Sequence, residues 1–197
     1  METNRLEAFS DGVLAIIITI MVLELKVPHA VEQVSHVATL ADLKPILPVF
    51  LSYVLSFIYI GIYWVNHHHF FHAVHKVSGG LLWANLHLLF WLSLIPFTTA
   101  WMGENHFTTW PVAIYGVNLL ASAVAYTIAA RIAVQLEGPN SEIARALGRD
   151  KKGNISLALY TISIPIAFYA PMVSCAIFVL VAMIWFVPDK RIERVLG

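Results

Sequence analysis

The sequence has 197 residues, of which 59% are hydrophobic and only 12% are charged, and its formal net charge at pH 7 is zero. Soluble domains carry about 25% charged residues, so this composition excludes an ordinary soluble domain and indicates an integral membrane protein. A neutral chain also gives no reason to expect nucleic acid as a partner, and the single cysteine, Cys175, excludes an intrachain disulfide.

Six apolar segments predict an all-α protein that crosses the lipid bilayer six times. A helix needs about 20 apolar residues to cross, which the first four segments reach and the last two approach. Because the motif of the first segment is not repeated, residues 1–197 are expected to form one domain. The predicted spans are residues 6–27, 47–71, 81–102, 110–134, 155–170 and 172–187.

The connections between the spans carry two further helical signals. Residues 28–44 place Val31, Val34, Ala38 and Ala41 at helical spacing, as a short interfacial helix would. In the charged loop 135–154, Ser141 is suited to begin a short helix over residues 142–147, and Gly148 to end it.

The distribution of lysine and arginine predicts the orientation. Ten of these residues lie on the side of both chain ends and two, Lys26 and Lys44, lie on the other. Cytoplasmic loops carry the excess of positive charge, so both termini are expected in the cytoplasm.

The first span begins with charged residues and then carries no charge until Glu24. Gly12, Ile16, Thr19, Ile20 and Leu23 fall on one helical stripe, and Asp11 points about 140° away from Ile16 at 100° per residue. The stripe alone does not decide whether this face meets a pore, lipid or another helix, because the rest of the span is apolar too.

Five of the nine histidines lie between Trp64 and His75. Three interpretations stay open: a hydrogen-bonded network between Asp11 and one of His67, His68 or His69, solvated interfacial histidines, or a metal site on His68, His72 and His75 at i, i+4 and i+7. The third span adds Trp83, Asn85 and His87, polar groups that need partners at membrane depth.

Several signals of other functions are missing from the sequence. There is no phosphate-binding glycine loop and no carboxylate in the middle of any span. These absences argue against an enzyme and against a proton-coupled pump. Glu24, at the outer end of the first span, is placed either to attract cations or to pair with Lys26.

The motif Arg5-xxx-Phe9-Ser10-Asp11-x7-Thr19 resembles the signature of the TMEM175 family of potassium channels, found in endolysosomes and in bacteria. Trp64 with His67 and His68, and the run 83–97, support the resemblance. One copy of the motif is typical of the bacterial, single-repeat type.

The resemblance implies a homotetramer in which four first helices surround a central pore that passes potassium ions, without enzyme activity, cofactor or metal. It implies a multi-pass protein in the plasma membrane of a bacterium or archaeon. Ile16, Ile20 and Leu23 would form the constriction, shaped by Thr19. The residues expected to hold the helices in place are Arg5, Phe9, Ser10, Asp11, His67, His68, Trp83 and His87.

Two alternatives from other classes accompany this prediction. The first is a proton-conducting protein or secondary transporter that uses the histidine network. The second is a membrane metalloenzyme built on His68, His72 and His75.

Overall fold

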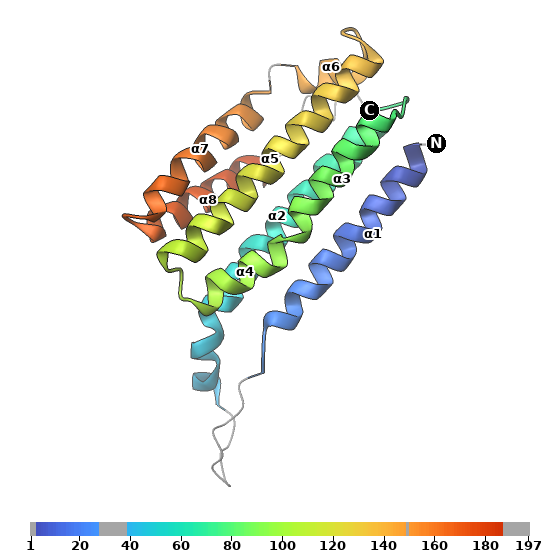
Figure 1. Cartoon of the computed structure of the whole chain (residues 1–197). Coiled ribbons are helices and arrows are strands. Elements are labelled where there is room, and N and C mark those ends of the chain that lie inside the picture. The colour runs from blue at the N-terminus through green and yellow to red at the C-terminus, as the bar shows by residue number, and fades with distance from the viewer. Residues whose placement is uncertain (1–2, 28–38, 149, 187–197) are drawn as a thin grey trace.

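The structure is a computed structural model that describes residues 3–27, 39–148 and 150–186, and the regular elements in these ranges are all helices. Figure 1 shows a bundle in which α1 forms one edge and α7 and α8 lie at the opposite edge, beyond α5. The expected all-α architecture is confirmed. The elements are α1 (Thr3–Met21), η1 (Val22–Glu24), η2 (Leu40–Ile46), α2 (Leu47–His72), α3 (Gly79–Ser93), α4 (Ile95–Glu104), α5 (Thr109–Glu137), α6 (Glu142–Leu147), α7 (Lys151–Ala167) and α8 (Pro171–Phe186).

Four segments in the described ranges are long and apolar enough to cross a bilayer: Thr3–Glu24, Leu40–His72, Gly79–Glu104 and Thr109–Glu137. They match the first four predicted spans. The α7 and α8 helices are shorter, with 17 and 16 residues. A helix rises 1.5 Å per residue, so each covers about 25 Å of a hydrocarbon core that is about 30 Å thick.

Local capping sets several helix boundaries. The Ser78 hydroxyl accepts the Leu81 N–H at the start of α3, and Ser141 accepts the Ala144 N–H at the start of α6. Gly148 follows α6 with a φ of +43°, which favours glycine. The predicted short helix over residues 142–147 is therefore confirmed. Asp150 accepts the Gly153 N–H, which makes α7 begin at Lys151, earlier than the predicted 155.

The third predicted span, residues 81–102, is not one continuous helix. It consists of α3 and α4, which meet at Leu94, one residue before the first turn of α4 with its Pro96. Proline lacks the N–H that a helix interior needs, so an interruption at this place has a clear cause. Of the predicted interfacial helix, residues 28–38 lie outside the described residues, and Leu40–Ile46 form the 3-10 helix η2.

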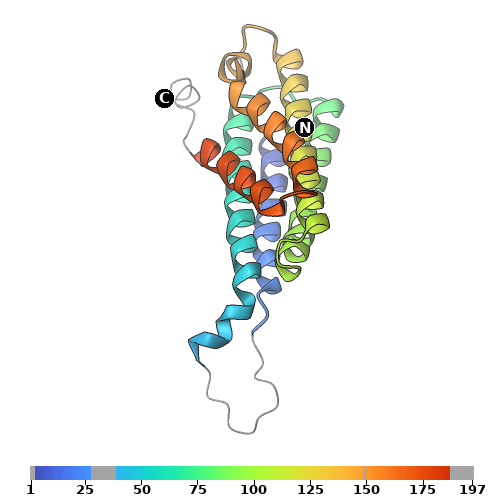
Figure 2. The same cartoon turned by 90° about the vertical axis from the view of Figure 1, so that its left-hand side faces the viewer.

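The two ends of the bundle differ in their number of lysine and arginine residues. The end that carries α6 holds six of the described lysines and arginines: Arg5, Lys76, Arg131, Arg145, Lys151 and Lys152. The other end, near η2, holds Lys26 and Lys44. Figure 2 shows these ends, with η2 pointing away from α6. The sides assigned from the sequence therefore correspond to opposite ends of the molecule.

One close helix contact fixes α4 against α2. A Cβ atom built on Gly103 would lie 2.7 Å from the Val49 Cα and would also overlap the Ser52 hydroxyl. Only glycine permits this approach. Nearby, the Ser56 hydroxyl bonds the hydroxyls of Thr99 (2.6 Å) and Tyr115 (2.9 Å), which joins α2, α4 and α5 in the core.

Candidate functional site: the first helix and its anchors

The α1 helix has two different faces. Leu6, Ser10, Leu14, Ile17 and Met21 are buried against the rest of the chain. The other face carries the first four residues of the stripe predicted to line a pore, Gly12, Ile16, Thr19 and Ile20, and the last, Leu23, follows in η1; all five are exposed in the single chain. Ile16 is 58% and Leu23 is 72% exposed. An apolar stripe this exposed on a membrane helix faces lipid, another subunit or a pore between subunits.

Thr19 makes only local contacts within this chain. Its hydroxyl lies 2.9 Å from the Ile16 carbonyl oxygen and 3.0 Å from that of Ala15 and donates back to its own helix. The hydroxyl oxygen can still accept hydrogen bonds, so exposed Thr19 offers a polar acceptor within an otherwise apolar stripe.

An open groove of about 630 Å³ lies between α1 and α4. Ile16 and Ile20 line one wall, and Phe97 and Trp101 line the other. At the end of the groove that lies beside η1, the Lys26 ammonium lies 3.0 Å from the Glu104 carboxylate. Lys26 thus pairs with Glu104 on α4 and not with Glu24, which leaves Glu24 on the groove lining as the candidate for attracting cations.

A buried chain of hydrogen bonds anchors the opposite face of α1. Ser10 donates to the Leu6 carbonyl (2.9 Å), Asn85 on α3 donates to the Ser10 hydroxyl (2.9 Å), and the Asn85 amide oxygen lies 2.8 Å from His67 Nε2. The Leu6 carbonyl can only accept, so the Ser10 hydroxyl donates to it and in turn accepts from the Asn85 amide nitrogen. The amide oxygen of Asn85 then needs a donor, so His67 must donate from Nε2. The other ring nitrogen, Nδ1, is buried without a hydrogen-bond partner among the described residues.

Besides this chain of hydrogen bonds, two more contacts join α1 to α2. The Trp64 indole donates to Asp11 Oδ1 at 3.0 Å. One helical turn closer to the chain start, His68 Nδ1 lies 2.7 Å from Glu7 Oε1. Trp64 and His68 are four residues apart on α2, and Glu7 and Asp11 are four apart on α1, so the two pairs stack along the helix contact.

Hydrogen bonds thus join α1 to α2 and α3, but their partners differ from the predicted ones. In the described residues the hydrogen bond of Asp11 goes to an indole and not to a histidine. His67 and Ser10 meet only through Asn85, and His68 meets Glu7. Glu7 was not among the predicted residues, and its position one turn before Asp11 was the available signal.

Four predicted members lie outside this network within one chain. Arg5 and Phe9 are exposed, and Trp83 is 74% exposed. His87 is also exposed and accepts a hydrogen bond from Trp91, one turn along the same helix, at 2.9 Å. The exposed faces of Phe9 and Trp83 are available for contacts with lipid or another subunit.

The histidine triad proposed for a metal does not form. The α2 helix ends at His72, so His75 lies beyond it and loses the helical spacing. Glu137 instead accepts the backbone N–H groups of His75 (2.8 Å) and Lys76 (2.6 Å). Within the described residues, no group of three histidine, cysteine or acidic side chains is placed to hold a metal ion.

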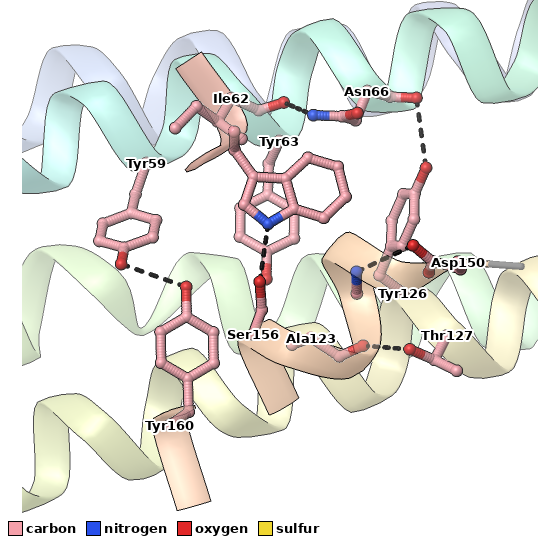
Figure 3. Close-up of a pocket in the computed structure, with 12 residues that line it drawn as sticks. Tyr59, Ile62, Tyr63, Asn66, Ala123, Tyr126, Thr127, Asp150, Ser156 and Tyr160 are labelled. Carbon is pink, nitrogen blue, oxygen red and sulfur yellow. Dashed lines mark hydrogen bonds between the residues drawn. The ribbon is translucent and has the colours of Figure 1, made fainter. Parts of the chain in front are cut away.

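A second cavity, of about 40 Å³, lies inside the bundle between α2, α5, α7 and α8. Figure 3 shows its tyrosine-rich lining, in which Tyr160 donates to the hydroxyl of Tyr59 at 3.1 Å. Trp185 donates to Ser156 at 2.9 Å in the same place. This volume suits a few water molecules and is too small for an ion pathway through the subunit. The α1 face is therefore the stronger candidate site.

Comparisons with known proteins identify the family of the chain. A family model described as endosomal/lysosomal potassium channel TMEM175 matches residues 5–96, which include α1 and the anchoring residues on α2 and α3. A protein of Chryseobacterium sp. (strain P1-3), named as a potassium channel, is 54% identical over 194 residues, which are 98% of this chain and 97% of that protein. The chain belongs to the TMEM175 family.

Other members of the family extend the comparison. The crystal structure of a Chamaesiphon minutus homologue of TMEM175, itself described as a lysosomal potassium-selective channel, superposes with a TM-score of 0.81 at 28% identity, and the match covers 94% of this chain and 96% of that one. The Gallus gallus member, named an endosomal/lysosomal proton channel, is 36% identical over 83 residues, 40% of this chain and 17% of that protein. This TMEM175 member is thus a multi-pass membrane protein of a channel family and not an enzyme.

Proposed function

We propose that this TMEM175 member is a potassium-selective channel whose pore is lined by α1 from four identical subunits. The observation that carries the proposal is the division of α1 into an anchored face and an exposed apolar face. The full-length relative of Chryseobacterium named as a potassium channel supports the choice of ion. Residues 1–197 would form one domain with six spans, in which α7 and α8 supply the fifth and sixth.

The anchors give the exposed face a defined direction. The Ser10–Asn85–His67 chain and the Asp11–Trp64 and Glu7–His68 pairs fix the rotation of α1 against α2 and α3. In a fourfold arrangement, the Ile16, Ile20 and Leu23 side chains would then form successive rings around the axis. Such rings close a pore by excluding water, and a small rotation or widening admits water and ions.

Selectivity in this arrangement follows from dehydration. An apolar ring offers no set of carbonyl oxygens to replace the hydration shell, so it favours the ion that loses water more readily, which is potassium over sodium. Thr19 adds one hydroxyl per subunit between the rings of Ile16 and Ile20. Glu24 lies on the groove lining near the outer mouth, where its charge would raise the local concentration of cations.

The positive charge at the α6 end of the bundle supports cytoplasmic termini, and the bacterial relatives support a place in the plasma membrane. For the proton-conducting alternative, the Ser10–Asn85–His67 chain ends on the Leu6 carbonyl oxygen, which cannot pass a proton onward. This favours an anchoring role for these groups over a proton relay.

Thiol modification tests the proposed pore face directly. In a Cys175→Ala background, Leu23→Cys places a thiol on the proposed pore face, and Thr161→Cys places one on an exposed position of α7. A positively charged thiol reagent should block potassium flux into proteoliposomes in the first variant and leave the second unchanged. Block in both or in neither contradicts a pore on α1. A pH-sensitive dye in the same vesicles measures proton flux, and protons carried without potassium would favour the alternative.

A further inference from the structure

Asn118 on α5 occupies the break between α3 and α4. It is 3% exposed, and its carboxamide lies beside the backbone of Trp91 and Ile95. When its nitrogen faces the Trp91 carbonyl and its oxygen faces the Ile95 N–H, it donates at 2.9 Å and accepts at 3.3 Å, and its oxygen also lies 3.2 Å from the Thr98 hydroxyl. The reverse orientation would set N–H against N–H and carbonyl against carbonyl, so the first orientation is the correct one.

The two backbone groups that Asn118 contacts are the pair that the helix break separates. In a continuous helix the Ile95 N–H would donate to the Trp91 carbonyl, four residues earlier. Here the Leu94 N–H takes that carbonyl at 3.2 Å in a tighter turn. The carboxamide thus takes the place of the lost Ile95–Trp91 hydrogen bond. Insertion of a side chain between such backbone groups is one of the recognised causes of a sharp helix kink.

The break decides where α4 lies relative to α1. Ile95 and Met102 of α4 are buried in the same core as Ile17 and Met21 of α1. Phe97 and Trp101 line the groove whose other wall carries Ile16 and Ile20. The Lys26–Glu104 pair then joins the outer ends of the two helices.

We propose that Asn118 is a positioning residue for conduction. Its carboxamide sets the direction in which α4 leaves the break, and α4 in turn supports the outer half of α1, where the constriction would lie. The inference rests on the proposed function, since it concerns the pore assigned to α1. Asn118 itself touches neither the pore face nor the permeant ion, and it acts through α4.

Helix position and ion selectivity are measured on the same variants. Lys26→Cys with Glu104→Cys, in a Cys175→Ala background, reports the distance between the outer ends of α1 and α4 through the rate of cross-linking by a bifunctional thiol reagent. Proteoliposome flux reports the potassium-to-sodium ratio. Asn118→Leu keeps the size of the side chain and removes both hydrogen bonds to the backbone of Trp91 and Ile95, together with the contact to the Thr98 hydroxyl. The matched control is Ser122→Ala, one turn along the buried face of α5, whose hydroxyl donates only to the Asn118 backbone carbonyl.

Asn118→Leu should slow cross-linking and lower the potassium-to-sodium ratio by about fivefold each, the order expected for two hydrogen bonds in a membrane protein. Ser122→Ala should behave like the wild type. Wild-type cross-linking and wild-type selectivity in Asn118→Leu overturn the proposal. If wild-type protein carries no potassium, the proposed function fails, and cross-linking alone then decides whether Asn118 positions α4.

Asn118→Asp covers the case in which the leucine variant does not fold. A carboxyl group buried among apolar side chains stays protonated, so it keeps one donor and one acceptor of nearly the same shape. We expect this variant to cross-link and to select potassium within about twofold of the wild type. A shift as large as that expected for leucine would show that the two hydrogen bonds are not what positions α4.

Discussion

Asn85→Leu is the sharpest test of the anchoring of α1. Asn85 is 1% exposed and makes two hydrogen bonds, to His67 and to Ser10. Leucine has a similar size and makes neither. Ser10 keeps its bond to the Leu6 carbonyl, but the His67 ring then has no partner on either nitrogen among the described residues.

The expected cost follows from these groups. Side-chain hydrogen bonds between membrane helices average about 0.6 kcal/mol each, which sets a lower limit of about 1.2 kcal/mol for the pair. Leaving the buried His67 N–H unpaired adds about 1–3 kcal/mol. The free energy of unfolding should therefore fall by about 2–4 kcal/mol, at least roughly a thirtyfold change in the unfolding equilibrium.

The assay is equilibrium unfolding in mixed detergent micelles, followed by tryptophan fluorescence. Thr161→Val is the control, because this exposed hydroxyl bonds only to its own helix and its loss should change stability by less than about 0.5 kcal/mol. The double variant Asn85→Leu with His67→Phe should be more stable than Asn85→Leu alone, since removing both partners leaves no buried N–H unpaired. Additive losses in the double variant would refute the hydrogen-bonded chain.

Three further predictions concern the contacts of α1 and α4. Gly103→Ala should destabilise the protein by about 1–3 kcal/mol, because the added Cβ would meet the Val49 backbone. Gly61→Ala, with open space around it, should leave stability unchanged. Thermal unfolding of the two variants measures the difference. Asp11→Ala should lose the assembled tetramer in size-exclusion chromatography, and Asp11→Asn, which keeps the acceptor for Trp64, should retain it; a stable Asp11→Ala tetramer contradicts the anchor. The Glu104 carboxylate, by its hydrogen bond and then by its charge, raises the pKa of Lys26 above 10.5, so Lys26 keeps its charge between pH 6 and 9 and loses it only as the pH rises through the raised pKa. Lys26→Met should therefore leave the pH profile of flux between pH 6 and 9 unchanged. An altered profile would contradict this prediction, because a solvent-exposed ion pair is expected to contribute little.

Much of the fold follows from local sequence signals. The uncharged run after Asp11 predicts α1, and Ser141 with Gly148 predicts both ends of α6. The interruption of the third span is different. Pro96 marks the place, but the geometry of the break depends on Asn118, which comes from another helix and has no local signature.

The anchors show the same limit. Trp64, His67 and His68 all lie on the part of α2 that faces α1 or α3, and which of them meets Asp11 depends on the register between two helices. A shift of one residue exchanges the partners, and a sequence pattern does not set that register. The metal triad was wrong for a local reason, because α2 ends at His72 and leaves His75 outside the helical spacing.

Potassium flux into proteoliposomes, with wild type and Ile16→Asn side by side and with sodium and N-methylglucamine as comparison ions, tests the proposed pore most directly. Wild-type protein should pass potassium in preference to sodium and exclude N-methylglucamine. Asparagine at position 16 makes the apolar ring polar and hydrated, so sodium flux should rise and the preference should be lost. Flux that is indifferent to this substitution, or no flux in either protein, would contradict a conducting constriction on α1.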